Sequence, residues 1–205
     1  MHRKSVMTMA TLALAAIGLS AQQLKEIPAD ALKVGTPAPP LVFETVIGGP
    51  KPAEITWDAL KGKVVVLDFW GTWCGPCVDN LPHLNNLVRS YKGKPVQFIS
   101  VGHENSRKVE WFLRKYPIEA WIVLDIQLTM YKSYTAWGIP HAVVVDAQGK
   151  VAAILHPKHL TQTIIDAVVE GRAPVYPKLT AASYWNPVTA AEHFRKVGEE
   201  EPPNQ

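Results

Sequence analysis

Cys74 and Cys77 are the residues of this 205-residue chain whose type and spacing most directly suggest chemistry. They follow a run of β-branched residues that predicts a buried strand, and apolar residues at helical spacing come after them. Cys74 is therefore expected at the N-terminus of a helix, where free N–H groups and the helix dipole favour a thiolate. Thiolates attack disulfides, so this pattern favours thiol–disulfide exchange.

The spacing of the pair fits this chemistry. Cys77 lies one helical turn after Cys74 and can reach its sulfur, which would release a mixed disulfide. The two residues between them, Gly75 and Pro76, keep the pair close enough to close a ring. Proline is suited to the start of a helix because it has no N–H group to lose there.

Two other interpretations of the pair stay open but are less favoured. Half of a zinc site would need further ligands, yet the chain has no second cysteine pair, and His83 is too isolated to complete a site. A purely structural disulfide would restrain little of the unfolded chain, because the ring is so small. With two cysteines in all, a scaffold held by several disulfides is excluded.

Composition bounds the class of protein. Hydrophobic residues make up 47% of the chain and charged residues 19%, which is enough to bury a core and excludes disorder by composition. The length suits one domain with a tail. The formal net charge is +3, and without Arg3 and Lys4 of the N-terminal segment it is about +1. We therefore expect no nucleic-acid partner.

The N-terminus has the parts of a secretory signal peptide. A short basic region ends at Lys4, and an apolar, small-residue stretch follows with no charge before Lys25. We expect residues 1–21 to be a signal peptide cleaved after Ser20 or Ala21. The alternative is an uncleaved anchor, the one case in which we expect membrane contact, although the run is short for a bilayer span. The predicted location is periplasmic or secreted, where disulfide chemistry is permitted.

Periodicity and turn residues predict a mixed α/β sheet with helices on both faces. Pro82 is expected to kink the helix that follows the cysteines. Residues 172–205 read as a proline-rich, irregular extension, with a short helix after the capping box at 189–192. Strands are expected at 41–46 (an edge strand), 64–67, 96–101, 121–124, 142–145 and 151–155, the last two joined by a turn at 146–149; helices are expected at 56–60 (capped by Thr56), 78–91, 106–116 (capped by Ser106), 128–134 and 161–170.

Two segments resemble the thioredoxin superfamily. Trp73-Cys74-Gly75-Pro76-Cys77 is similar to the thioredoxin active-site motif, and Gly138-Ile139-Pro140-His141 resembles the segment that holds the thioredoxin cis-proline. Pro82 also matches a helix-kinking proline of that family. The resemblance implies a thioredoxin fold in which Pro140 is cis and faces the cysteine pair. A cis X–Pro bond is uncommon and marks a needed tight geometry.

The layout further resembles the TlpA/ResA/DsbE-like branch of exported thiol–disulfide oxidoreductases. An extra helix–strand stretch lies at 105–124, an N-terminal strand or hairpin extension precedes the site, and the likeness covers residues 34–171 as one thioredoxin-like domain. It implies a monomer that exchanges electrons with protein thiols and disulfides and is recharged by an upstream thiol donor. No cofactor is implied beyond the Cys74–Cys77 dithiol. Gly75-Pro76 resembles the reducing members, which often serve cytochrome c maturation or copper-site assembly.

The resemblance also assigns roles to single residues. Asp68 matches the buried thioredoxin carboxylate that is proposed to exchange a proton with the second cysteine, and burial would raise its pKa. Its alternative is a salt-bridged carboxylate at the sheet edge. The branch often has Asn at that position and an acidic residue where Asn80 stands. The expected substrate-binding residues are Trp73, Gly75, Pro76, Ile139 and His141, of which His141 either tunes the pair electrostatically or touches a partner.

Two rival functions remain. Peroxiredoxins share this fold but use a threonine three residues before the attacking cysteine, whereas Thr72 lies two before Cys74. A Cu(I)-handling module would exploit the preference of thiolates for Cu(I). The copper carriers it would resemble use a different cysteine spacing and a distal histidine. Peroxide consumption, or tight Cu(I) binding without turnover, would favour one of these functions.

Overall fold

A computed structural model describes residues 32–176 of the chain. The predicted signal peptide at 1–21 and most of the predicted extension at 172–205, with its short helix, lie outside this range. Six strands form one sheet in the order β1-β4-β3-β2-β5-β6. The strands are β1 (Thr45–Ile47), β2 (Val64–Phe69), β3 (Val96–Gly102), β4 (Trp121–Leu124), β5 (His141–Val145) and β6 (Val151–Leu155); the α-helices are α1 (Gly75–Ser90), α2 (Ser106–Leu113), α3 (Thr129–Ser133) and α4 (Gln162–Val169); η2 (Pro52–Glu54) and η3 (Pro157–His159) are short 3₁₀ helices.

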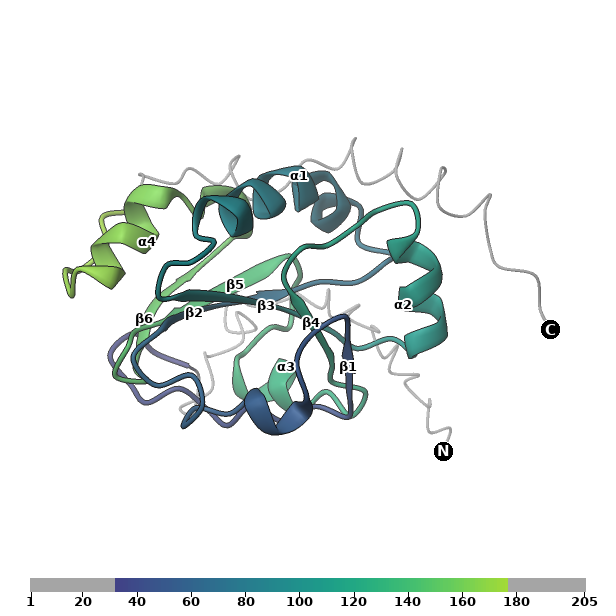
Figure 1. The fold of residues 1–205 in the computed structure, drawn as a ribbon, viewed down its shortest axis with the longest axis horizontal. Coiled ribbons are helices and arrows are strands. Elements are labelled where there is room, and N and C mark those ends of the chain that lie inside the picture. The colour runs from purple at the N-terminus through teal and green to yellow at the C-terminus, as the bar shows by residue number, and fades with distance from the viewer. Residues whose placement is uncertain (1–31, 177–205) are drawn as a thin grey trace, which may run out of the picture. The chain divides into compact units, whose positions relative to one another are not determined.

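The sheet is mixed, as predicted, and helices cover both of its faces (Figure 1). Strands β2, β3 and β4 are parallel and are joined by α1 and α2, while β5 and β1 run antiparallel to their neighbours. The order β4-β3-β2 means that the two connections, from β2 through α1 to β3 and from β3 through α2 to β4, cross the sheet in the same direction. Because such crossovers are right-handed, α1 and α2 lie on the same face of the sheet. Helix α3 lies on the opposite face of the sheet from α1 and α4 (Figure 1). Among the described helices, none is long and apolar enough to cross a membrane.

Strand β2 is the centre of the core. All six of its residues are buried, and it has a hydrogen-bonded neighbour on each side. Val64 and Val66 pack in the cluster that contains α1 and α4, whereas Leu67 and Phe69 pack with α3 on the other face. A strand covered on both faces reads as a continuous apolar run rather than an alternating one. This accounts for the predicted strand at 64–67.

Helix α1 begins directly after the first cysteine. Cys74 is its N-cap and Pro76 lies in its first turn. The buried side chains recur every three or four residues, among them Cys77, Val78, Leu81 and Leu84. Pro82 lies inside the helix, which continues to Ser90, and the kink there stays a prediction.

The edge strand is shorter than predicted. It was expected at residues 41–46, but β1 spans Thr45–Ile47 and pairs with the edge of β4. Just before β1, the Glu44 N–H still donates to the carbonyl oxygen of Leu124 at 2.9 Å. Further upstream, the carbonyl oxygen of Pro39 accepts from Trp57 Nε1 at 2.8 Å and from the Tyr134 hydroxyl, so the chain there is bonded to residues outside β4.

Two predicted helix starts are corrected. Asn105, not Ser106, caps α2, since its Oδ1 accepts the Lys108 N–H at 2.9 Å. Asparagine and serine are equally good N-caps, so adjacent candidates cannot be ranked from type alone.

Thr56 Oγ1 accepts the Ala59 N–H at 3.2 Å, but only turns follow and no helix forms at 56–60. The chain instead reverses at Gly62, whose φ of +81° suits glycine.

Candidate active site

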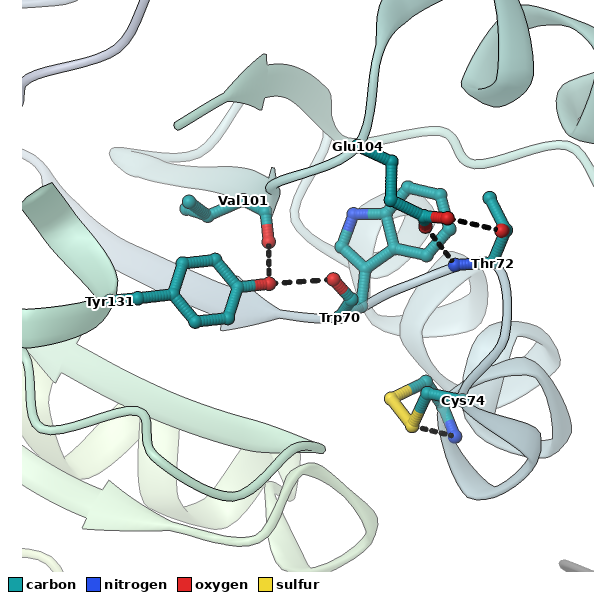
Figure 2. Close-up of a disulfide and its surroundings, with 7 residues drawn as sticks. Trp70, Thr72, Cys74, Val101, Glu104 and Tyr131 are labelled. Carbon is teal, nitrogen blue, oxygen red and sulfur yellow. Dashed lines mark hydrogen bonds between the residues drawn. A yellow bond between two sulfur atoms is a disulfide. The ribbon is translucent and has the colours of Figure 1, made fainter. Parts of the chain in front are cut away.

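The two cysteines form a disulfide at the junction of β2 and α1. Their Cα atoms are 5.2 Å apart. The Cys77 N–H donates to Cys74 Sγ at 3.3 Å, so the sulfur at the helix N-terminus occupies an acceptor position (Figure 2). This geometry confirms the predicted place of Cys74 at the start of a helix. In the reduced protein the same N–H group and the helix dipole would stabilise a thiolate on Cys74.

Both sulfurs are largely covered, and their aromatic neighbour is not. Cys74 is 3% exposed and Cys77 4%, whereas Trp73 is 40% exposed. Gly75 is buried and Pro76 is half-buried. Within residues 32–176, no group of three or more His, Cys, Asp or Glu side chains is arranged to hold a metal ion.

The second predicted motif lies at the same end of the sheet. The Ile139–Pro140 peptide bond is cis, which confirms the conformation implied by the resemblance. Strand β5 pairs antiparallel with β2 and places His141 opposite Phe69. Pro140, just before β5, and Trp70, just after β2, therefore lie at the same end of these two strands. Ile139, Pro140 and His141 are all half-buried.

Asp68 points toward the face of the sheet that α1 covers. Leu67 and Phe69 pack on the other face, and side chains alternate along a strand. The carboxyl is 5% exposed, and burial raises its pKa to about 7. Asp68 makes no ion pair with any described residue, and β2 is a central strand. The alternative of a salt-bridged carboxylate at the sheet edge is therefore wrong.

His141 lies on the opposite face from Asp68. Its ring is 5.8 Å from that of Phe69, measured between centroids. Burial lowers the pKa of His141, and a hydrogen bond with the backbone of Tyr134 offsets this only in part. The imidazole is therefore neutral at pH 7, so it carries no full charge that could act on the cysteine pair there.

Glu104 is a site residue that the sequence did not reveal. Its carboxylate accepts the Thr72 N–H at 2.5 Å and the Thr72 hydroxyl at 2.8 Å (Figure 2). Its side chain is 9% exposed and pairs with Lys108 at 2.8 Å. Thr72 stands two residues before Cys74, so Glu104 fixes the segment that leads into Cys74. Thirty-two positions separate the two partners, and no local pattern links them.

Tyr131 is a second site residue that the sequence did not reveal. Its hydroxyl lies 2.6 Å from the carbonyl oxygen of Trp70 and 3.0 Å from that of Val101 (Figure 2). Burial raises its pKa, so the group stays a protonated donor. Asp125, which is fully buried, accepts the backbone N–H groups of Thr129 and Tyr131 and anchors α3. Through Tyr131, α3 holds the ends of β2 and β3 where the active-site segment begins.

Replacing Glu104 by alanine should destabilise the oxidised protein by about 1 to 3 kcal/mol, because the buried Thr72 loses both acceptors. Urea unfolding of the oxidised protein measures the change. Lys108→Ala is the matched control: it removes only the partly exposed ion pair and should cost less than about 1 kcal/mol. Equal unfolding midpoints for Glu104→Ala and the parent protein would contradict the assigned role.

Comparison with known proteins agrees with this geometry. The Redoxin family model matches residues 33–168, so the chain belongs to the Redoxin family. The thiol-disulfide oxidoreductase ResA of Bacillus subtilis (strain 168) is 30% identical over 127 residues, which are 62% of this chain and 69% of that protein. ResA of Bacillus anthracis is 32% identical over 121 residues, 58% of this chain and 68% of the relative.

Solved structures agree as well. A protein from Chlorobium tepidum assigned as thiol:disulfide interchange protein DsbE is 28% identical with a TM-score of 0.54, over 62% of this chain and 86% of that one. The thioredoxin domain of a Bacteroides vulgatus thiol-disulfide oxidoreductase is 24% identical and supports the fold, with a TM-score of 0.59 over 67% and 99% of the two chains. The protein is thus a thioredoxin-fold thiol–disulfide oxidoreductase of the ResA/DsbE type, with a Cys-x-x-Cys pair.

Proposed function

We propose that the protein is an exported, monomeric reductant that passes two electrons from an upstream thiol donor to disulfides in partner proteins. The observation that carries the exchange chemistry is the position of Cys74 Sγ at the start of α1, where it accepts the Cys77 N–H; the direction of electron flow rests on the sequence between the cysteines. This position favours the thiolate on Cys74. The Gly75-Pro76 pair between the cysteines adds the resemblance to reducing members of the superfamily.

The exchange proceeds in two balanced steps. The Cys74 thiolate attacks one sulfur of a partner disulfide, forms a mixed disulfide and releases the other partner sulfur as a thiolate. Cys77 then loses its proton and attacks Cys74 Sγ, which forms the Cys74–Cys77 disulfide and frees the second partner thiolate. Two electrons have passed to the partner, and the upstream dithiol restores the reduced pair by the same steps in reverse.

Asp68 is the proposed acceptor of the Cys77 proton. It lies on the α1 side of β2, and Cys77 is buried in the cluster on that face. Because its pKa is raised to about 7, the carboxylate can both take up and release a proton near neutral pH. Replacing Asp68 by asparagine should leave the attack of Cys74 intact and slow the attack of Cys77.

The partner is proposed to bind as an extended segment beside Pro140. Trp73 offers an exposed aromatic surface, and the half-buried Ile139 and His141 flank the cis-proline. Extended segments are held mainly by backbone hydrogen bonds, which suits an enzyme that accepts different disulfide sequences. No cofactor beyond the dithiol enters the proposal.

Export and the client class are parts of the same proposal. The basic start and the uncharged apolar stretch up to Lys25 support cleavage near Ala21 and a periplasmic or secreted protein. In that compartment, cysteine pairs that must receive haem or copper are oxidised unless a reductant serves them. The proposed clients are therefore apoproteins of cytochrome c or of copper sites.

A disulfide-bonded peptide with the Cys-x-x-Cys-His sequence of haem attachment tests the direction of transfer. The reduced protein should convert it to the dithiol, with a change in tryptophan fluorescence as the Cys74–Cys77 disulfide forms. If the oxidised protein instead oxidises the peptide dithiol to completion, the proposal of a reductant is wrong. The mass of the protein from a periplasmic fraction tests export, since cleavage should remove about 20 residues.

A further inference from the structure

Ser100 lies beside Asp68 in the sheet, although it belongs to another strand. Strands β2 and β3 are parallel and pair Asp68 with Ser100. Paired residues on neighbouring strands are about 5 Å apart. Within β3, Phe98 packs in the cluster of α1, while Ile99 and Val101 pack on the other face. Ser100 alternates with Ile99 and Val101 and therefore points toward the same face as Asp68.

The Ser100 hydroxyl is polar in an apolar setting. The residue is fully buried, and its Oγ makes no hydrogen bond to any residue in 32–176. On its other side, the register places Ile122 of β4 beside it. Buried hydroxyls are costly unless they are hydrogen-bonded. The one polar neighbour that the register supplies is Asp68, which itself has no side-chain partner among the described residues.

We propose that Ser100 is a positioning residue for the proton transfer, and that its hydroxyl donates a hydrogen bond to the ionised carboxylate of Asp68 through one buried water. The water accounts for the absence of a direct bond between the two side chains, and a bridge of this kind is nearly as favourable as a direct one. The inference rests on the proposed role of Asp68 as the acceptor of the Cys77 proton.

The bond has a defined effect on the reaction. A hydroxyl can bond to either form of a carboxyl, but its bond to the charged form is the stronger one. Ser100 therefore counteracts part of the burial effect and keeps Asp68 ionised over more of the neutral range. Without the hydroxyl, a smaller fraction of the protein would have a base ready when Cys77 must lose its proton.

In the oxidised protein the pKa of Asp68 can be measured directly, because disulfide-bonded cysteines do not titrate. The ¹³C chemical shift of the Asp68 carboxyl, followed against pH, reports its pKa. Ser100→Ala should raise the midpoint by roughly one pH unit. Ser100→Thr keeps the hydroxyl and should titrate like the parent protein. Ser90→Ala, at the exposed end of α1, is the control for a serine hydroxyl elsewhere and should change nothing. An unchanged midpoint in Ser100→Ala, or an equal rise in Ser100→Thr, would overturn the inference.

The rate of the Cys77 attack distinguishes the role of Ser100 from the proposed role of Asp68. At pH 7 the attack of Cys77 should slow about twofold in Ser100→Ala. Without the hydroxyl, burial alone sets the pKa of Asp68 at about 7, so about half of the carboxyl is then protonated, whereas the parent, with a pKa about one unit lower, is almost fully ionised. In an Asp68→Asn background, Ser100→Ala should have no further effect. A loss that persists there would show that Ser100 does not act through Asp68. If Asp68→Asn leaves the rate of the Cys77 attack unchanged, Asp68 is not the base. A midpoint that still moves in Ser100→Ala would then support the hydrogen bond from Ser100 to Asp68 without the proposed role of Asp68.

Discussion

Replacing Cys74 by serine should reduce disulfide-exchange turnover to the uncatalysed rate. Serine cannot supply a thiolate, and Cys77, which is 4% exposed and lies one turn into α1, is not at the helix N-cap that favours the charged sulfur. The measurement is the dithiothreitol-driven reduction of insulin, followed by precipitation of its free chains. Serine retains the size and polarity of the site, so the variant should fold.

Cys77→Ser is the matched control for the division of roles. It keeps the attacking cysteine and removes the resolving one, so a mixed disulfide between Cys74 and the partner should accumulate in stoichiometric amounts. Mass spectrometry detects the adduct without turnover. Full turnover by Cys74→Ser, or equal trapping of partners by the two variants, would contradict the assigned order of attack.

Replacing Asp68 by asparagine should stabilise the protein at pH 8 and have little effect at pH 4. Burial raises the pKa of Asp68 from 3.8 to about 7, so the folded state holds this proton more tightly than the unfolded chain does. The stabilisation from the neutral carboxyl is complete below about pH 4 and is lost as the pH rises through 7. A difference of about 3 between the two pKa values sets an upper limit of about 4 kcal/mol. Asparagine has no charge to bury and escapes this loss.

Urea unfolding of the oxidised protein at pH 4, 6 and 8 tests this expectation, because the disulfide-bonded cysteines contribute no titration. Asp79→Asn, on the exposed face of α1, removes a carboxylate near the same helix end without changing the core. Its effect on stability should be small, because the side chain is exposed. If Asp68→Asn is less stable than the parent protein at pH 8, the buried charge does not destabilise the folded state and the expected loss of stability with rising pH is wrong.

The parts of the fold with a strong local signal were predictable from the sequence. The four-residue strand β4 was expected at 121–124 and observed there, and the central strand followed from its unbroken apolar run. The two ends of the site were found because each is a contiguous motif, one around Cys74 and one around Pro140. That both lie at the same end of the sheet was implied only by the resemblance to thioredoxin, since about sixty residues of chain separate them.

The polar contacts that hold the site were not predictable, because each joins residues that only the fold brings together. Glu104 reaches Thr72 across a βαβ crossover, and the partners of the Tyr131 hydroxyl are two backbone carbonyl groups. Neither contact produces a periodic or compositional pattern in the amino-acid sequence. Ser100 sits beside Asp68 solely through the register of β2 against β3, which a single sequence does not reveal.

An equilibrium redox titration of the mature protein decides whether the Cys74–Cys77 pair is a reductant. Trp73 adjoins Cys74, so its fluorescence should follow the oxidation state of the pair in buffers of reduced and oxidised dithiothreitol or glutathione. We expect one two-electron transition at or below about −230 mV, the range of thioredoxin-like reductants. A transition between about −120 and −180 mV would contradict the reductant and point to an oxidant or isomerase. The absence of any two-electron transition would contradict the exchange chemistry itself.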